Sequence, residues 1–418
     1  MLNQVFKNLL RRKIRTLLTV VGIAVGVAMI VALGAMGEGL RTGYISMFSG
    51  SGADLALIQK GSYDITMSAV DEGVVNQVAS MPEVKAATGM IVHNLAAPGL
   101  PYFYVFGHDL QGFAVERFKI VQGKSLSEAT RTARGSRAII LGVKAAEALK
   151  LNVGDSLPLP GGTFRVVGIY ETGSGFEDAG SVLSLPDAQQ LAQKARQVGA
   201  VQVKLRDVRQ TEQVRARLQR LYPRLTVSQS GDIANQQQMV GMIQGFALGI
   251  ALLAVVIGGV GMTNTVMMST FERTHEIGTL RALGWSRQRV VWMVLAESVL
   301  LGAAGGLVGC LVGAALIQPM SRSPALSFLQ GKLTPALLLQ GMLTAVVLGS
   351  VGGIYPAWWA SRLLPVEAMR YEGGTGDSKL RLPPVKSEIL RSLWRRRGRT
   401  FLTVLGIGIG LSAVMALG

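Results

Sequence analysis

Few residues in this sequence have the types and the spacing that catalysis requires. Gly123-Lys124-Ser125 resembles the end of a phosphate-binding loop, but the motif G-x-x-x-x-G-K-[ST] needs its first glycine at position 118, which is Phe118. His275-Glu276 begins like the zinc motif H-E-x-x-H, yet Thr279 stands where the second histidine should be. We therefore interpret the first segment as a turn and expect no metal site at the second.

The other candidate bases and nucleophiles are equally isolated. His93 and His108 have no matching pattern of acid and nucleophile around them, which favours a structural or surface role. Cys310 is the one cysteine, so an intramolecular disulfide, a cysteine-based zinc site and an iron–sulfur cluster are excluded. The sequence predicts no catalytic residue and no cofactor bound by this chain itself.

The composition instead indicates a membrane protein. Of the 418 residues, 49% are hydrophobic and 16% are charged, whereas soluble chains carry about a quarter charged residues. A helix needs about 20 mostly apolar residues to cross a bilayer. Four windows meet this requirement, at 17–37, 239–268, 290–318 and 333–360, and a further apolar run covers 400–418. The first window is too long for the apolar core of a secretory signal peptide.

The positive charge gathers beside these windows. Segment 1–16 has five bases and no acid, 269–289 has four bases and two acids, and 361–399 has ten bases and four acids. In the large segment 38–238 the charges nearly cancel, with 21 bases and 18 acids. By the positive-inside rule we expect a multi-pass protein of the cell (inner or cytoplasmic) membrane, with a cytoplasmic N-terminus and an extracytoplasmic segment 38–238. Bases beside membrane ends, without interleaved aromatic residues, argue against nucleic acid as a partner.

Residues 38–238 have the pattern of a mixed α+β domain. Runs rich in β-branched or aromatic residues predict strands at 53–58, 102–106, 137–141, 163–170 and 201–205. Gly161-Gly162 predicts a hairpin between 156–159 and the fourth of these strands. Helices are expected at 143–149, 187–196 and 211–221. The predicted fold class is an α-helical membrane protein with a large extracytoplasmic α+β domain inserted between spans 1 and 2.

An internal repeat extends this description. Residues 11–34 reappear at 395–418, with 13 of 24 positions identical. The matches include polar residues such as Arg15/Arg399 and Thr19/Thr403, which shared hydrophobicity does not require. Because transporters are often built from internal repeats, the repeat predicts that a second four-span unit begins near residue 400 and continues past Gly418.

Glycines four residues apart form stripes along the predicted spans. Such residues let helix backbones approach closely in lipid, although glycine is also common in membrane helices generally. The stripes are Gly22 and Gly26; Gly241, Gly245 and Gly249; and Gly305, Gly309 and Gly313. We expect these positions to pack the spans into a bundle.

Four segments carry a resemblance to a known family. Residues 269–287, STFERTHEIGTLRALGWSR, resemble the signature of FtsX-like permeases, the membrane subunits of MacB-type (type VII) ABC transporters. Residues 353–370, GIYPAWWASRLLPVEAMR, at the close of the fourth predicted span, resemble the ending of that family. Residues 140–155 and 164–170 resemble the MacB-like periplasmic core domain. The resemblance therefore spans nearly the whole chain, in the expected order.

The resemblance implies one span, a large extracytoplasmic domain and three further spans. It also implies two four-span units and two ATPase subunits in each transporter. The repeat favours two units fused in one chain, whereas a chain ending at Gly418 would favour a homodimer. ATP and Mg²⁺ would be bound by the ATPase partner, because this sequence lacks a Walker A motif. The lipid bilayer and an extracytoplasmic adaptor or effector are further candidate partners.

In that family the stretch 269–287 is the coupling helix that docks on the ATPase. Side chains at spacings of three or four share one face of such a helix. The expected coupling residues are Glu272, Arg273, Glu276, Ile277, Leu280, Arg281 and Gly284. Without the resemblance, a solvated linker would be the simpler interpretation of these charges.

Glu297 is the one acid inside a predicted span, where charges are costly. Glu297 either pairs with a basic residue near the cytoplasmic surface or snorkels toward that surface. The alternative is that it takes part in transport. The leading functional hypothesis is a permease subunit that couples ATP hydrolysis by a separate subunit to motion of the extracytoplasmic domain (mechanotransmission), for export or extraction of a substrate. The alternatives are a non-transporting regulator of an extracytoplasmic hydrolase or sensor, and a membrane scaffold without an ATPase.

Overall fold

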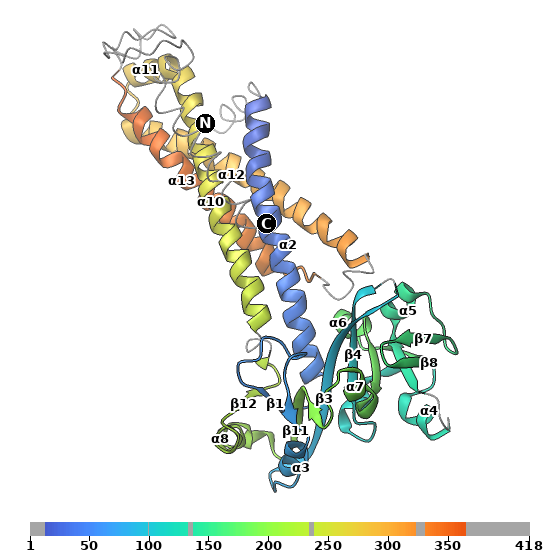
Figure 1. Ribbon diagram of the computed structural model, residues 1–418. Helices are drawn as coiled ribbons and strands as arrows, with labels where there is room; N and C mark the ends of the chain where they lie inside the picture. Colours follow the sequence, from blue (N-terminus) through green and yellow to red (C-terminus); the bar gives the residue numbers. More distant parts are fainter. Residues whose placement is uncertain (1–12, 99, 133–136, 234–237, 323–330, 365–418) are drawn as a thin grey trace, which may run out of the picture. The chain divides into compact units, whose positions relative to one another are not determined.

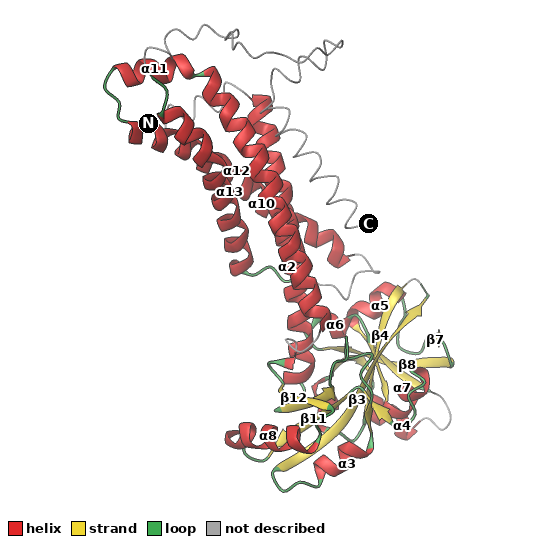
Figure 2. Cartoon of the chain, turned by 60° about the vertical axis from the view of Figure 1, so that its left-hand side comes forward, coloured by secondary structure: helices red, strands yellow, loops and turns green. Residues whose placement is uncertain are grey.

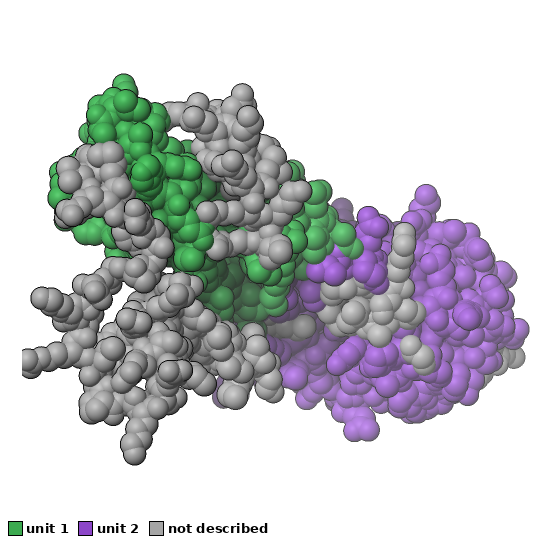
Figure 3. All heavy atoms as spheres, turned by 90° about the horizontal axis from the view of Figure 1, so that it is seen from above, with its two compact units in different colours: residues 1–32, 246–315, 333–418 green, residues 33–245, 316–332 purple. Residues whose placement is uncertain are grey.

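The computed structural model describes residues 13–98, 100–132, 137–233, 238–322 and 331–364. The chain divides into two compact units, coloured separately in Figure 3. We call residues 1–32, 246–315 and 333–418 the bundle unit, and residues 33–245 and 316–332 the α+β unit. The second copy of the repeat, at 395–418, and most of the basic segment 361–399 lie outside the described residues.

Four helices in the described part of the chain are long and apolar enough to cross a membrane. They are α2 (Lys13–Ser49), α10 (Gln238–Glu272), α12 (Arg287–Arg322) and α13 (Pro335–Ser361), as Figure 1 shows. The first three extend beyond the spans predicted from hydropathy at both ends. The fourth begins at Pro335 because Thr334 caps it, its side chain accepting a hydrogen bond from the Leu337 amide at 3.4 Å.

Helix α2 departs most from its predicted length. Hydropathy ends the span at residue 37, but the helix continues to Ser49. Its last turns carry large side chains on one side, and Leu40, Tyr44, Met47 and Phe48 are each at most 2% exposed. These side chains join the hydrophobic core of the α+β unit, so burial in that core replaces lipid as the reason to stay helical.

The α+β unit is built on one ten-stranded mixed sheet (Figure 2). The strands are β1 (Leu55–Gln59), β3 (Val84–Ala97), β4 (Leu100–His108), β5 (Lys119–Gly123), β6 (Ala138–Gly142), β7 (Ser156–Leu159), β8 (Gly162–Glu171), β9 (Ser181–Ser184), β11 (Ala200–Leu205) and β12 (Leu225–Gln229). Their order is β12-β1-β11-β3-β4-β9-β6-β8-β5, with β7 paired to β8. The β4–β9 and β6–β8 pairs are parallel and the others antiparallel. A separate small pair joins β2 (Val70–Asp71) to β10 (Gln197–Val198).

The sheet separates two hydrophobic cores because successive side chains on a strand point to opposite faces. In β1, Leu55 and Leu57 belong to one core, whereas Ala56 and Ile58 belong to the other. The first core is covered by α3 (Gly73–Ala79), α5 (Val143–Leu149), α7 (Leu185–Leu191) and α8 (Thr211–Leu221). The second core contains the C-terminal turns of α2 and Phe176 of the short helix α6 (Gly175–Asp178). The end of the first long helix is thus built into the sheet domain.

Most predicted elements of this domain are present, with corrected ends. Helices α5 and α8 have the predicted bounds, and the hairpin joins β7 to β8. Helix α7 begins earlier than expected because Ser184 caps it, and it ends at Leu191 rather than residue 196. The left-handed backbone of Gln193 and Arg196 interrupts any longer helix there. The sequence analysis did not predict the 14-residue strand β3, nor β5, β9, β12, α3 or α4 (Leu126–Thr132).

Helix α12 occupies a central position in the bundle unit. Along one side, a Cβ atom added to Gly305 or Gly309 would lie 2.7 Å from the Cβ of Ile23 or of Val27 in α2. Along another side, a Cβ on Gly306 would lie 2.6 Å from the Cβ of Ala345 in α13. Distances below 3.0 Å leave no room for a side chain, so glycine is what allows α12 to approach both neighbours.

Candidate coupling site and helix interfaces

The predicted coupling segment forms a short separate helix, α11 (Thr274–Ala282), between α10 and α12. The break from α10 falls at Arg273, whose backbone angles are φ −107° and ψ 14°. Thr274 stabilises the break, since its hydroxyl donates to the Phe271 carbonyl at 2.8 Å. The segment is therefore a helix set off from α10, rather than a continuation of it.

Arg273 connects this helix to the neighbouring span. Its Nε lies 3.1 Å from a carboxylate oxygen of Glu276, and its Nη1 lies 3.1 Å from a carboxylate oxygen of Glu297 on α12. The Arg273 and Glu297 side chains are 16% and 10% exposed, so this pair is largely shielded from solvent. Of the interpretations left open for Glu297, the structure shows the pairing with a basic residue.

Ile277 packs α11 against α12 and α13. It is 2% exposed and belongs to one hydrophobic cluster with Val290 and Met293 of α12 and Ala357 and Ala360 of α13. The sequence analysis placed Ile277 among the ATPase contacts, but its side chain packs into the bundle and is not available to a partner. Of the two large apolar residues predicted for the docking face, Ile277 is a core residue, whereas Leu280 is half-buried.

The end of α11 presents a different apolar side chain. Gly284, with φ +93°, closes the helix in a Schellman motif, in which the Trp285 amide donates to the Leu280 carbonyl at 3.1 Å. Leu283, one residue earlier, is 76% exposed. Thus Gly284 has a backbone role, and the turn that it permits projects Leu283 outward. Leu283 was not among the predicted coupling residues, although it lies three residues after Leu280 and seven after Glu276, which is the spacing of one helical face.

The other predicted coupling residues lie at various depths on α11. Glu276 is exposed and Leu280 is half-buried. Glu272 is exposed at the end of α10. Arg281 is also half-buried, and its Nε atom is buried without a hydrogen-bond acceptor among the described residues. The surface that α11 can offer therefore combines Glu272, Glu276 and Leu283.

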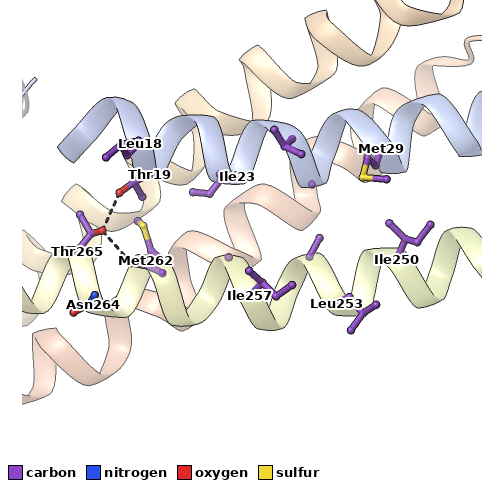
Figure 4. A pocket seen from close by; sticks show the side chains of 16 residues that line it. Leu18, Thr19, Ile23, Met29, Ile250, Leu253, Ile257, Met262, Asn264 and Thr265 are labelled. Atoms are coloured by element: carbon purple, nitrogen blue, oxygen red, sulfur yellow. Dashed lines mark hydrogen bonds between the residues drawn. The ribbon is translucent and has the colours of Figure 1, made fainter. Parts of the chain in front are cut away.

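Helices α2 and α10 contact each other and line a groove that lies between them (Figure 4). The hydroxyl oxygens of Thr19 and Thr265 lie 2.9 Å apart, and a Cβ on Gly26 would lie 2.8 Å from the Cβ of Ala254. The groove has a volume of about 600 Å³ and is lined almost entirely by apolar side chains and glycines. Several long side chains of both helices remain exposed, among them Leu18, Val25 and Leu252.

Four glycines of the predicted stripes make no close contact with another part of the chain that the structure describes. No described atom lies within 4 Å of a Cβ built on Gly22, Gly241, Gly245 or Gly249. The expected close packing of these four positions is therefore not found among the described residues. The other predicted glycines, Gly26, Gly305, Gly309 and Gly313, each approach a second described helix closely.

A buried ion pair holds the C-terminal end of α2 in the α+β unit. Arg117, at the end of the 3-10 helix η1 (Phe113–Arg117), donates from Nη1 to the Ser46 carbonyl at 3.0 Å and to the Met47 carbonyl at 2.6 Å. Arg117 also pairs with Glu177 of α6, which is 1% exposed. Burial lowers the pKa of Arg117 to about 10, so the side chain stays charged at neutral pH. The cation therefore satisfies carbonyls at the helix end, where the helix dipole also favours it.

Aromatic packing strengthens the same junction. The Phe176 ring lies 5.6 Å from the Tyr44 ring and 4.9 Å from the Tyr104 ring, measured between centroids. A Cβ on Gly43 would lie 2.8 Å from the Cβ of Phe176, so glycine lets α2 sit closely on α6. The Tyr44 hydroxyl donates to Asp64. Sequence analysis did not single out Arg117 or Glu177, because their partners are 70 and 60 residues away.

The histidines considered for chemistry are isolated in the structure as well. His108 is 2% exposed, and neither of its ring nitrogens has a partner among the described residues. Burial, with a smaller contribution from the nearby Arg117 charge, lowers the pKa of His108 to about 3. Burial also lowers the pKa of His93. In the ranges that the structure describes, no group of three or more His, Cys, Asp or Glu residues could hold a metal ion.

Comparisons with known proteins decide the family. The model of the MacB-like periplasmic core domain matches residues 16–221, and the model of the FtsX-like permease C-terminal domain matches residues 248–365. The chain belongs to the MacB/FtsX-like ABC transporter permeases. The first match covers α2 and most of the sheet domain. The second match covers α10, α11, α12 and α13.

Individual relatives agree with this assignment. The chain is 27% identical over 410 residues to the macrolide export ATP-binding/permease protein MacB of Bdellovibrio bacteriovorus, covering 89% of this chain and 61% of the relative. It is 24% identical over 399 residues to an ABC transporter permease of Methanocaldococcus jannaschii, covering 88% of this chain and 96% of that protein. A pyoverdine export ATP-binding/permease protein, PvdT of Pseudomonas savastanoi, is 26% identical and is 58% covered.

Among solved structures, the periplasmic region of MacB from Actinobacillus actinomycetemcomitans matches 44% of this chain and 91% of its own, at 16% identity and a TM-score of 0.35. The chain spans about 60% of the length of the MacB and PvdT relatives. The permease is a multi-pass membrane protein with a periplasmic-type domain between its first and second spans, because four described helices are able to cross a membrane and the periplasmic core domain model matches the segment between the first two.

Proposed function

We propose that this chain is the membrane subunit of an ABC transporter and that α11 docks on a separate ATPase subunit. The observation that supports the proposal best is the combination of a rigid base and an exposed tip. Arg273 and Ile277 fix α11 to the bundle, while Glu276 and Leu283 point outward. A force applied at such a tip is passed to the helices beneath it, because close-packed interiors transmit strain.

The distribution of charge supports the orientation. The bases flanking the spans favour a cytoplasmic α11 and an extracytoplasmic α+β unit in the cell membrane. ATP and Mg²⁺ would be held by the ATPase partner. We further propose that α2 carries motion toward the α+β unit, since this one helix contributes to the cores of both units. This is mechanotransmission: chemistry in one subunit moves a domain in another.

The open faces of α2 and α10 suggest where a second permease unit packs. Gly22, Gly241, Gly245 and Gly249 lie on these helices with no described atom close to them, in the spacing that small residues use at helix contacts in lipid. The second unit is either the one that the repeat predicts or another copy of this chain. Because the export relatives act on macrolides and pyoverdine, we propose export or extraction as the direction of work, with the substrate left open.

The proposal is tested by purifying the full-length protein in mild detergent from its native membranes and identifying the subunits that come with it. We expect a nucleotide-binding subunit with the wild type, and its loss from a Glu276→Lys, Leu283→Asp double variant. The matched control is Glu171→Lys, Val153→Asp, which makes the same charge changes at an exposed glutamate and an exposed aliphatic residue of the α+β unit. An ATPase that remains bound to the α11 variant, or that is absent from the wild type, would contradict the docking site.

A further inference from the structure

The positive charge of the α+β unit is concentrated in one short stretch. Residues 204–224 contain seven bases and two acids, a net charge of +5, whereas the whole of 38–238 has 21 bases and 18 acids. The rest of the domain is therefore slightly acidic. The stretch includes the end of β11 and all of α8, so the sequence places a basic helix on the surface of a nearly neutral domain.

Helix α8 is a fixed platform for these charges. Val214 and Leu218, one turn apart, are buried against the sheet. The Gln219 side chain donates to the Leu225 carbonyl at 2.7 Å and accepts from the Val227 amide at 3.0 Å, which ties α8 to strand β12. Because the helix is held at both its apolar face and its side, its outer residues keep a defined spacing.

Two hollows flank the C-terminal end of α8. One, of about 500 Å³, is lined by Glu83, Gln213, Arg217 and Arg220 among others, and the second, of about 820 Å³, is lined by residues that include Lys60, Asp71, Tyr222 and Arg224. Leu221 borders both hollows and is 56% exposed. We call Lys60, Arg217, Arg220, Leu221 and Arg224 the α8 basic surface.

Two acids lie beside the α8 basic surface, and each accepts a hydrogen bond from a described residue. Glu83 pairs with Arg217, and Asp71 accepts a hydrogen bond from the Gly73 amide at 2.7 Å. Lys60, Arg220 and Arg224 are exposed and form no ion pair with the described residues. The surface thus carries three cations without acid partners around one exposed leucine.

We propose that the α8 basic surface binds an acidic segment of an extracytoplasmic protein, with an apolar side chain of that segment against Leu221. Guanidinium groups bind carboxylates through paired hydrogen bonds, and arginine and tyrosine are enriched at protein interfaces. The hollows are concave on both sides of Leu221, a shape that receives a protruding segment and not the plane of a bilayer surface. An anionic membrane surface is the alternative ligand, and the experiment must distinguish it from an acidic protein segment.

This surface deepens the proposed function by assigning a site to an extracytoplasmic partner, and it rests on that proposal for its cellular role. Its physical test does not involve the ATPase. Failure of peptide binding would therefore not contradict docking of the ATPase on α11. Failure of ATPase docking would likewise not contradict peptide binding by the α8 basic surface.

The experiment uses the full-length protein in nanodiscs of zwitterionic lipid and a fluorescent peptide of alternating glutamate and leucine, with binding followed by anisotropy. We expect binding by the wild type and a loss of at least about tenfold in affinity for Arg220→Glu, Arg224→Glu. A milder Arg220→Gln, Arg224→Gln variant should show an intermediate loss. The matched control, Lys124→Glu, Arg165→Glu, makes the same charge change at exposed residues elsewhere in the domain.

Three results would overturn the proposal. The first is no peptide binding by the wild type, and the second is an equal loss in the control variant. The third is equal binding of a lysine–leucine peptide. If phosphatidylglycerol vesicles bind to the wild type but not to the Arg220, Arg224 variants, and the acidic peptide binds to none of them, the surface belongs to a membrane and not to a protein partner.

Discussion

The two halves of helix α2 are held in different ways. Residues up to 32 belong to the bundle unit, where α2 contacts α12 through Gly305 and Gly309, and where Leu17 and Leu18 remain more than 60% exposed. From residue 33 the helix belongs to the α+β unit, where Tyr44 and Phe48 are fully enclosed and its last carbonyls are bound by Arg117. One helix thus shows two kinds of stabilisation.

The difference follows from the solvent around each half. In lipid, exposed leucines cost nothing, so helices gain by close backbone approach at small residues. In water, the same helix must bury its large apolar side chains and satisfy its terminal carbonyls. The first half is therefore sensitive to added volume, and the second to lost charge and lost aromatic packing. Variants can test each part of this comparison.

The largest effect is expected at Arg117. Arg117→Met leaves Glu177 buried without its cation and should destabilise the α+β unit by about 3–5 kcal/mol. The double variant Arg117→Met, Glu177→Leu removes both charges and should recover much of that loss. Pulse proteolysis of the full-length protein in detergent, over a series of urea concentrations, measures both. A double variant no more stable than the single one would show that the ion pair is not the cause.

In the lipid-facing half, Gly309→Leu should lower the free energy of unfolding by up to about 3 kcal/mol. A Cβ at this position would already lie 2.7 Å from the carbonyl oxygen of Ala24 and 2.7 Å from the Cβ of Val27, both on α2. Gly245→Leu, with no described atom within 4 Å, should leave the fold of the single chain unchanged. Size-exclusion profiles after heating compare the two. If Gly245→Leu instead separates two copies without unfolding either, the open face is the contact of the second permease unit; equal loss of folded protein in both variants would contradict the comparison.

His108 should make the α+β unit sensitive to acid. Its folded pKa of about 3 lies below the ordinary value of 6.5, so the unfolded state binds a proton first as the pH falls. Stability is then complete above about pH 6.5 and decreases toward pH 3, by about 2 kcal/mol at pH 5. Pulse proteolysis at pH 7 and pH 5 should show this loss in the wild type and a smaller one in His108→Gln. An identical pH dependence in both proteins would exclude His108 as its source.

The smallest effect is expected at Glu297. Glu297→Gln keeps an oxygen that can accept a hydrogen bond from Arg273, so we expect a change in stability below about 1 kcal/mol and transport close to wild type. Transport by the complex, reconstituted in vesicles with its ATPase, is the measurement. Loss of transport with unchanged stability would support the alternative role of Glu297 in moving substrate.

Sequence patterns predicted the parts of this molecule that depend on local spacing. The four spans follow from apolar runs, and α5 and α8 follow from their own periodicity. The extension of α2 to Ser49 could not be predicted in this way, because its cause is burial of Tyr44 and Phe48 in a core assembled from distant strands. The long strand β3 was missed because its core positions alternate only in part.

The candidate coupling site shows the same division. The helical spacing predicted that Ile277 contacts the ATPase. In the structure Ile277 is buried against α12 and α13 instead. Leu283 was missed although its spacing from Glu276 and Leu280 fits a helical face; its 76% exposure follows from its place at the end of α11, where the turn at Gly284 closes the helix. The Arg273–Glu297 pair joins residues 24 positions apart, beyond the reach of a local pattern.

The most direct test of the central claim measures whether ATP moves the α+β unit through α11. In a Cys310→Ser background, Arg165→Cys carries a spin label on the exposed surface of each α+β unit of the assembled transporter, and pulsed electron resonance reports the distances between labels. We predict that ATP shifts the distance distribution in the wild-type complex and that Leu283→Asp abolishes the shift. An unchanged distribution with ATP, or a shift that persists in Leu283→Asp, would contradict coupling through this helix.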